Sequence, residues 1–241
     1  LKNQGAIALS SSPAISVNGT YEHAVNGGTI PASTWNSGST CLITGITSTM
    51  ANGFSQSFYN LTYNCASQSA SLNMGMYNTT VNGDFNYLNG GASATETGLS
   101  NSAAGAGPNN VLTFNGNFNV NSSINTNQIC AHRSGSASTV TNLTVNIMGN
   151  LNITNGSFYL TRNTGIATMN WNLYGNLNMT GGVFNSSHTA ALFHFAKSGS
   201  QTYTKTAGTL TAANIVIDSL STVDAGTSAF DGTATINIKS G

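Results

Sequence analysis

Charged residues are scarce in this sequence. Only 5% of the residues are Asp, Glu, Lys or Arg, and the formal net charge is zero, whereas about 25% are charged in an ordinary soluble domain. Disordered chains usually combine low hydrophobicity with high net charge, but 39% of these residues are hydrophobic. No basic stretch suggests a nucleic-acid partner. The composition therefore argues against both a disordered chain and a nucleic-acid-binding protein.

Helix formers and long apolar runs are also missing. Asn and Gly interrupt nearly every stretch of the chain, and no apolar spacing of three and four residues persists, so we expect almost no helix. No apolar run reaches the roughly 18 residues that a membrane-spanning helix needs, so we expect no membrane span. The chain starts with Leu1 and has no visible signal peptide, so we expect a processed chain or a fragment of a longer parent.

Cysteine is rare, with residues only at positions 41, 65 and 130, too few for a disulfide scaffold. Cys41 and Cys65 lie close to one repeat apart, so two alternatives stay open. They form a disulfide between adjacent coils, or they are two free thiols in the core. Cys130 has no evident partner and is expected to be a small buried apolar residue.

What the sequence does contain is a repeat anchored on glycine. Four segments align without gaps, beginning at Gly83, Gly116, Gly149 and Gly175. In each segment the second and fourth residues after the glycine are apolar, and the third is an asparagine: Asn86, Asn119, Asn152 and Asn178. Such alternation is typical of a β-strand with one buried face. Each strand is followed by a turn rich in Asn, Ser or Gly, which suits a corner.

A strand–corner–strand unit of this size cannot bury its single apolar face alone, whereas stacked units close a continuous core. The repeat therefore predicts an all-β fold, a right-handed parallel β-helix (β-solenoid) of about nine or ten coils. We expect the four glycines and the four asparagines to form structural ladders along its axis. Residues 1–38 are interpreted as an N-terminal cap with irregular first coils, and residues 39–241 as the solenoid, which is expected to continue in a longer parent chain.

A β-sandwich is the main competing fold, because antiparallel strands also alternate. The repeats match strand to strand in the same direction, and few turns have the two-residue length of tight hairpins. Both features favour the solenoid.

Several segments resemble large repetitive cell-surface proteins of Bacteroidetes that are exported by the type IX secretion system. The segments that carry the resemblance are GGTIPASTW from Gly27 to Trp35, STCLITGIT from Ser39 to Thr47, FYNLTYNCASQ from Phe58 to Gln68, and the stretch from Gly199 to Gly232. The resemblance implies an extracellular location on a bacterial cell surface. In that group O-glycans are attached to Asp-Ser/Thr-aliphatic motifs, and Asp218-Ser219-Leu220 matches, which makes Ser219 a candidate O-glycosylation site.

An enzyme is the natural competitor to a structural role, because parallel β-helices include polysaccharide lyases and hydrolases. Glycoside hydrolysis needs two facing carboxylates, and calcium-assisted elimination needs several acids together with a base. Of the six acids, only Asp218, Asp224 and Asp231 cluster along the chain. The histidines are scattered and no nucleophile motif occurs. We therefore expect no enzyme, no catalytic or metal-binding residues and no cofactor.

Two non-enzymatic roles remain. A carbohydrate-binding adhesin would expose aromatic rings for stacking on sugars, and the candidates are Trp35, Tyr59, Tyr174 and Tyr203; packing in the core is the alternative for each. A structural stalk or filament subunit would associate end to end, with neighbouring coils of a longer chain or with like subunits. The structural role is favoured, the adhesin is the first alternative, with an extracellular polysaccharide as partner, and a β-helix lyase or hydrolase is the second.

Overall fold

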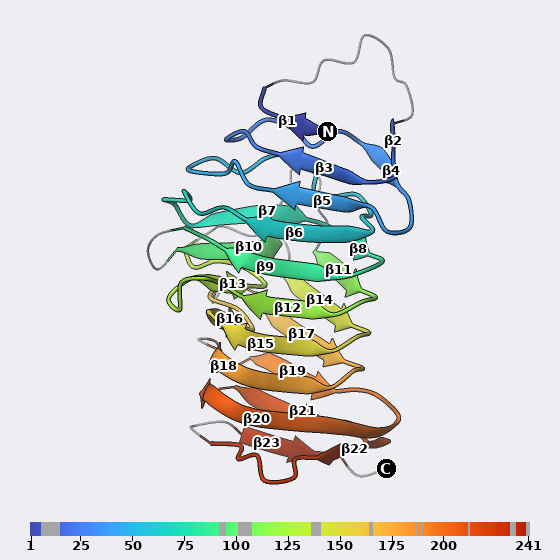
Figure 1. Cartoon of the computed structure of the whole chain (residues 1–241). Helices are drawn as coiled ribbons and strands as arrows, with labels where there is room; N and C mark the ends of the chain where they lie inside the picture. The colour runs from blue at the N-terminus through green and yellow to red at the C-terminus, as the bar shows by residue number, and fades with distance from the viewer. Residues whose placement is uncertain are drawn as a thin grey trace.

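The computed structural model describes residues 1–5, 15–91, 95–100, 108–135, 141–163, 166–186, 188, 190–211, 213–231 and 235–239. Over these residues the chain contains β-strands and turns but no helix. The strands lie one below another from the N-terminus to the C-terminus (Figure 1). The expectation of an all-β chain is confirmed.

The first wall of the stack is a run of parallel strands, each paired with the next. It is made of β1 (Lys2–Asn3), β3 (Thr20–His23), β5 (Thr40–Ile43), β6 (Asn60–Asn64), β9 (Phe85–Asn89), β12 (Phe118–Asn121), β15 (Leu151–Asn155), β18 (Leu177–Asn185), β20 (Gly199–Thr211) and β22 (Ser221–Asp224).

The second wall is also parallel. It consists of β7 (Leu72–Met76), β10 (Glu96–Ser100), β13 (Gln128–Cys130), β16 (Ser157–Tyr159) and the later part of β18. The long strand β18 turns the corner, because Leu177 pairs with Leu151 of the first wall and Val183 pairs with Ser157 of the second. Through β18 the two walls form one 14-stranded sheet.

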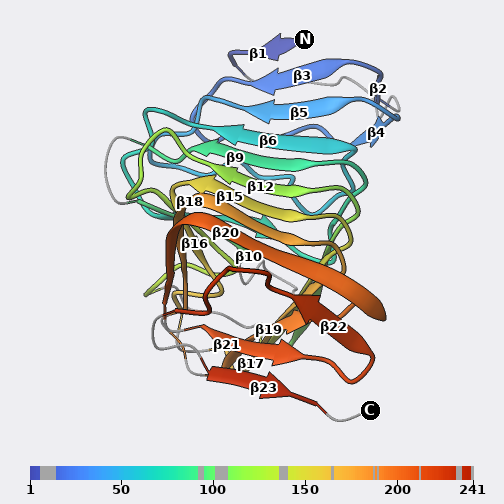
Figure 2. The ribbon, with the colours of Figure 1, turned by 60° about the horizontal axis from the view of Figure 1, so that its bottom comes forward.

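The third wall is a parallel sheet of 7 strands. It consists of β8 (Thr80–Val81), β11 (Asn109–Phe114), β14 (Asn142–Ile147), β17 (Thr168–Leu173), β19 (Ala191–Phe195), β21 (Asn214–Ile217) and β23 (Thr235–Ile238). Near the N-terminus, β2 (Ile15–Val17) and β4 (Ser33–Trp35) pair separately. When the lower end of the stack is turned toward the viewer, β22 (Ser221–Asp224) of the first wall and β23 of the third wall lie on opposite sides of the C-terminal end (Figure 2).

The core lies between the walls and is built from ladders of equivalent residues. One ladder runs down the first wall through Leu61, Phe85, Phe118, Leu151 and Leu177, and all five are fully buried. Because side chains alternate along a strand, the residues between them point outward.

The glycine column explains one feature of the repeat. A Cβ on Gly149 would lie 2.4 Å from the backbone oxygen of Gly116, and one on Gly175 would lie 2.1 Å from the backbone oxygen of Gly149. Successive coils therefore touch through their backbones at this corner, which only glycine permits.

The asparagines form a hydrogen-bonded outer ladder. The side-chain amide Nδ2 of Asn119 donates to Oδ1 of Asn86, that of Asn152 to Asn119, and that of Asn178 to Asn152, at 2.9, 2.7 and 2.9 Å. A second row lies beside it, in which Oδ1 of Asp84, Asn117 and Asn150 accepts the backbone N–H of the equivalent residue one coil later.

The first residues of the chain extend the same wall. Strand β1 pairs with β3, and β3 pairs with β5 in continuous register. The stack therefore passes through residue 38, and the division of the chain into a cap and a solenoid at that position stays a prediction.

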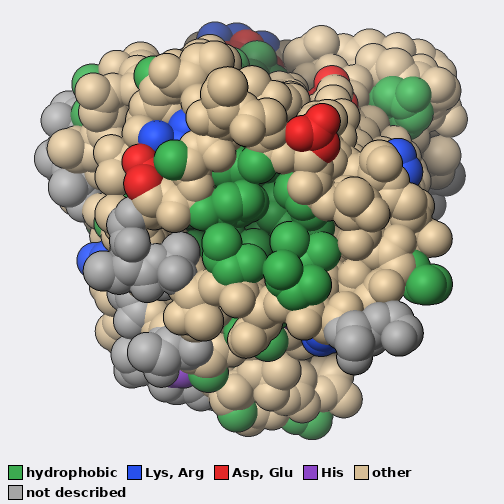
Figure 3. Space-filling view, turned by 90° about the horizontal axis from the view of Figure 1, so that it is seen from below, with side chains coloured by type: hydrophobic (Ala, Val, Ile, Leu, Met, Phe, Trp, Pro, Cys, Tyr) green, Lys and Arg blue, Asp and Glu red, His purple; other side chains and the backbone are tan. Residues whose placement is uncertain are grey.

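The C-terminal end of the stack exposes apolar side chains. Seen from below, hydrophobic side chains gather in the middle of the end face (Figure 3). In the last strand Ile236 is 40% and Ile238 is 75% exposed. The inner side chains of β23 therefore have no further strand below them among the described residues.

Candidate functional site

The only two arginines of the chain, Arg133 and Arg162, lie at equivalent positions of neighbouring coils. Cys130 of β13 pairs with Tyr159 of β16, and each arginine follows three residues later. The backbone N–H of Arg162 donates to the carbonyl oxygen of His132 at 3.0 Å. Both guanidinium groups therefore belong to one corner, between the second and third walls.

Glu96 of β10, one coil before Arg133 and two coils before Arg162, is the acid of this corner and is buried. Its Oε1 accepts from Nε of Arg162 at 3.1 Å and from the Ser134 hydroxyl at 3.0 Å, while Oε2 accepts the Ser134 backbone N–H at 2.6 Å. Burial raises the pKa of this carboxyl, but the hydrogen bonds from Ser134 and Arg162 outweigh burial and hold the pKa below its usual value. Glu96 is therefore an ionised anchor with little tendency to donate a proton.

The two guanidinium groups keep unused donors. Nε of Arg133 is buried and has no hydrogen-bond partner in the part of the chain that the structure describes, while its Nη1 donates to the carbonyl oxygen of Ser134 at 3.2 Å. The side chain of Arg162 is 29% exposed. The guanidinium carbon of Arg162 lies 4.7 Å from the centre of the Tyr159 ring, a cation–π contact. Among the described residues Glu96 therefore pairs with Arg162 and not with the side chain of Arg133.

Buried polar groups fix the segment that carries Arg133. The backbone N–H of Arg133 donates to Oδ1 of Asn73 at 3.2 Å. A Cβ on Gly98 would lie 1.9 Å from that Asn73 oxygen and 2.9 Å from the Arg133 nitrogen. The segment therefore lies directly on the outer face of β10, and only a glycine at position 98 leaves room for it.

His132 is a buried residue next to Arg133. Its Nδ1 lies 3.1 Å from Nδ2 of Asn163 and 3.2 Å from the carbonyl oxygen of Arg133. Burial lowers its pKa, so the ring is neutral at pH 7. We call Glu96, Arg133, Ser134, Tyr159 and Arg162 the arginine corner.

The three clustered acids of the sequence bind separate partners. Oδ1 of Asp218 contacts Nδ1 of His194 at 3.1 Å and Nζ of Lys239 at 2.8 Å. Asp231 pairs with Lys205 at 2.9 Å, and Asp224 accepts the backbone N–H of Gly226 at 2.9 Å. No group of three or more His, Cys, Asp or Glu side chains that could hold a metal occurs among the described residues.

Ser219 is exposed and lies in a turn, in which the backbone N–H of Ser221 donates to the carbonyl oxygen of Asp218 at 2.9 Å. Leu220 beside it is 71% exposed. The hydroxyl is accessible, and its glycosylation stays a prediction.

Two of the four candidate stacking rings are buried, which corrects the expectation for them. Trp35 packs against Phe58 and donates from Nε1 to Gln56. Tyr203 packs against Phe230, with ring centres 4.5 Å apart. Both face the core because they follow the inward parity of their strands. Tyr59 and Tyr174 are half-buried and remain candidates.

All three cysteines are buried free thiols, so the second alternative for Cys41 and Cys65 holds. Cys41 pairs with Leu61, and Cys65 lies four residues further along the chain. Four residues correspond to roughly 13 Å along a strand, whereas the Cα atoms of a disulfide lie about 4 to 7 Å apart.

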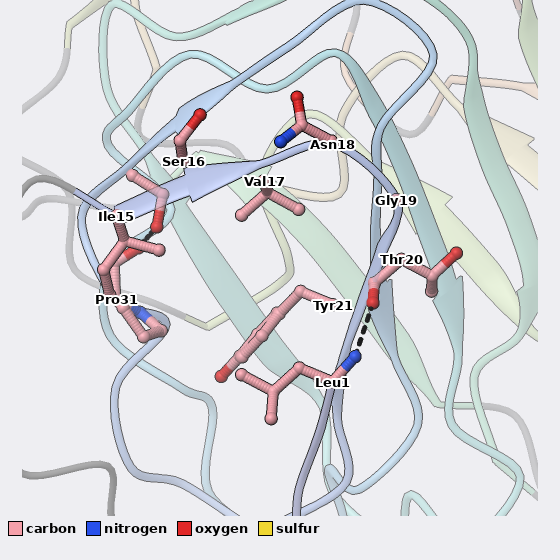
Figure 4. Close-up of a pocket in the computed structure, with 10 residues that line it drawn as sticks. Leu1, Ile15, Ser16, Val17, Asn18, Gly19, Thr20, Tyr21 and Pro31 are labelled. Atoms are coloured by element: carbon pink, nitrogen blue, oxygen red, sulfur yellow. Dashed lines mark hydrogen bonds between the residues drawn. The ribbon is translucent and has the colours of Figure 1, made fainter.

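A mostly apolar pocket of about 510 Å³ opens at the N-terminal end of the stack (Figure 4). Ile15, Val17, Tyr21 and Pro31 line it, together with Leu1, whose amino group donates to the carbonyl oxygen of Thr20 at 2.9 Å. The Tyr21 hydroxyl already contacts Asn3 and His23. The pocket therefore offers apolar surface but few unused polar groups.

Comparison with known proteins adds no relative. No protein-family model matches the chain, and searches of the curated proteins and of the solved structures also found no match. No helix of suitable length and apolarity to cross a membrane is present in the described parts of the chain.

Sequence reasoning missed the arginine corner because its members are far apart along the chain. Glu96 and Arg162 are 66 residues apart, and their segments carry none of the glycine-anchored repeats. The sequence did contain one signal for this corner. The chain has six basic residues, and each of its two arginines stands shortly after a short apolar segment that is expected to be a strand.

Proposed function

We propose that this chain is an extracellular structural and adhesive module of a bacterial surface, a rod section built as a right-handed parallel β-helix of about nine or ten coils. The observation that carries the proposal is the unbroken parallel pairing from β1 to β22. In a stack of this kind each coil is held mainly by its neighbours along the axis, which suits a rod. At about 4.8 Å per coil the rod is about 45 Å long.

The outer surface supports this role. The first wall presents an amide ladder whose hydrogen bonds run along the axis. Amide groups do not titrate, and the hydrogen bonds between them are little affected by salt. A surface of this kind stays solvated under changing external conditions, which suits a protein outside the cell.

The location is supported by the resemblance to repetitive surface proteins of Bacteroidetes and by the accessible turn at Ser219. The chain is then one part of an exported protein, and end-to-end contact with further coils or with like subunits covers the exposed apolar side chains of β23.

The test is surface labelling. Antibodies against the folded chain should label intact cells of the producing organism, and labelling should disappear when type IX export is blocked. Antibodies against a cytoplasmic protein serve as the control and should label only opened cells. A chain that is found only inside opened cells contradicts the proposal.

A carbohydrate-binding adhesin is the second candidate. The two remaining rings, Tyr59 and Tyr174, are half-buried and lie near the corner between the third and first walls. They offer limited area for stacking on a sugar. The arginine corner, with two guanidinium groups, is the stronger candidate for a ligand.

A further inference from the structure

We propose that the arginine corner binds the acidic groups of an extracellular polysaccharide, with Arg133 and Arg162 as the residues that contact a carboxylate or sulfate group. This inference goes beyond the structural role and concerns a different wall of the molecule from the amide ladders. It names a partner chemistry, an acidic sugar chain, that the neutral outer face of the first wall does not select.

The geometry provides two guanidinium groups for one acidic group. The arginines follow paired residues at the same offset, so their backbones are one coil apart, about 4.8 Å. Guanidinium groups bind carboxylates and sulfates through two parallel N–H donors, which lysine cannot match. An acidic group between the two side chains is therefore within reach of both.

Glu96 does not neutralise the corner. Among the described residues its oxygens accept three hydrogen bonds, two from Ser134 and one from Nε of Arg162, and none from Arg133. The guanidinium of Arg133 receives no carboxylate in the described part of the chain, and its Nε is buried without a partner. The Arg133 side chain as a whole is half-buried, so its remaining guanidinium donors can form charge-assisted hydrogen bonds with an acidic ligand.

A sugar chain fits the surroundings better than a nucleic acid or an acidic peptide. Nucleic acids carry closely spaced phosphates and need several cations along a stripe, but this chain has six basic residues in total, and only two are here. The Ser134 hydroxyl is bonded to Glu96, Asn163 is buried and bonded to His132, and Arg162 lies over the ring of Tyr159, so the two guanidinium groups carry the binding. Two positive groups without a longer basic stripe suit a sugar chain that carries an occasional acidic group.

The experiment measures binding of the purified full chain to three immobilised polysaccharides: polygalacturonate, which carries carboxylates, dextran sulfate, which carries sulfates, and uncharged dextran. The variant Arg133→Gln removes one guanidinium group. Arg133→Lys keeps the positive charge but lacks the two parallel N–H donors. The control Lys197→Gln also removes one positive charge, but from an exposed side chain that comes after the last residue of β19 and lies outside the arginine corner. Thermal unfolding of each variant establishes that it is folded, which is expected because the Arg133 side chain bonds, among the described residues, only to the carbonyl oxygen of Ser134.

We expect the native chain to bind one or both acidic polysaccharides and not dextran. Arg133→Gln should weaken binding about tenfold, Arg133→Lys by less, and Lys197→Gln by less than twofold. Binding to polygalacturonate alone identifies a carboxylate ligand, and binding to dextran sulfate alone identifies a sulfate ligand. The proposal is overturned if neither is bound, or if Lys197→Gln weakens binding as much as Arg133→Gln does. Arg133→Gln should leave the surface labelling of cells unchanged, so failure of the binding proposal is distinguishable from failure of the structural role.

Discussion

Asn119 and Asn86 lie side by side on successive coils, and the amide Nδ2 of Asn119 donates to Oδ1 of Asn86 at 2.9 Å. Asn152 donates in turn to Asn119 at 2.7 Å. Each amide in the middle of the ladder therefore acts once as donor and once as acceptor, and the ladder links coils that are far apart along the chain.

The variant Asn119→Ala should destabilise the fold by about 1 to 2 kcal/mol, because it removes two partly buried hydrogen bonds. Urea unfolding measures the change. Asn237→Ala is the matched control, since Asn237 is exposed on the last strand, and it should change stability by less than about 0.5 kcal/mol. Equal effects of the two variants would show that the ladder contributes nothing.

The variant Gly149→Ala should destabilise the fold by about 3 kcal/mol, because overpacking forces backbone shifts. The added methyl group would lie 2.4 Å from the Gly116 oxygen and 2.5 Å from its carbonyl carbon, and neither backbone atom can rotate away. For a chain of this size the melting temperature should fall by roughly 6 to 12 °C. Gly19→Ala is the control, because a Cβ there meets no atom of the described residues within 4 Å. An unchanged melting temperature for Gly149→Ala would contradict the close contact between coils.

The wall that carries these residues could be predicted from the sequence for a physical reason. Four of its strands follow the repeat glycines, and the strict alternation after each glycine places Phe85, Phe118 and Leu151 on the inner face. The second wall gave no such signal, since β10 is buried on both faces, with Glu96 among its buried residues. The outer face of β10 is covered by the segment at Arg133, which returns from the following coil. Contacts of that kind depend on how a loop folds back, and residue spacing does not encode them.

Acidification should weaken the attachment at Glu96. The pKa of this carboxyl is lower in the folded chain than its usual value, so the charged form stabilises the fold above about pH 4.5. That stabilisation is lost as the pH falls below this value toward the lower pKa of the folded state. Urea unfolding between pH 7 and pH 3 should show a steeper decline for the native chain than for Glu96→Gln, which is less stable at pH 7 but does not titrate. Parallel curves for the two proteins would contradict an ionised Glu96 in the fold.

The three cysteines should be unreactive until the chain unfolds. Burial raises the pKa of all three thiols, that of Cys65 to about 11, and the thiolate is the reactive form. Treatment with iodoacetamide at pH 8 should therefore leave the mass of the native protein unchanged. In denaturant, and without any reductant, the same treatment should add three carbamidomethyl groups, since all three thiols are free. A single added group would mean that Cys41 and Cys65 are bonded after all, which would require the register between β5 and β6, set by the pairing of Cys41 with Leu61, to be wrong.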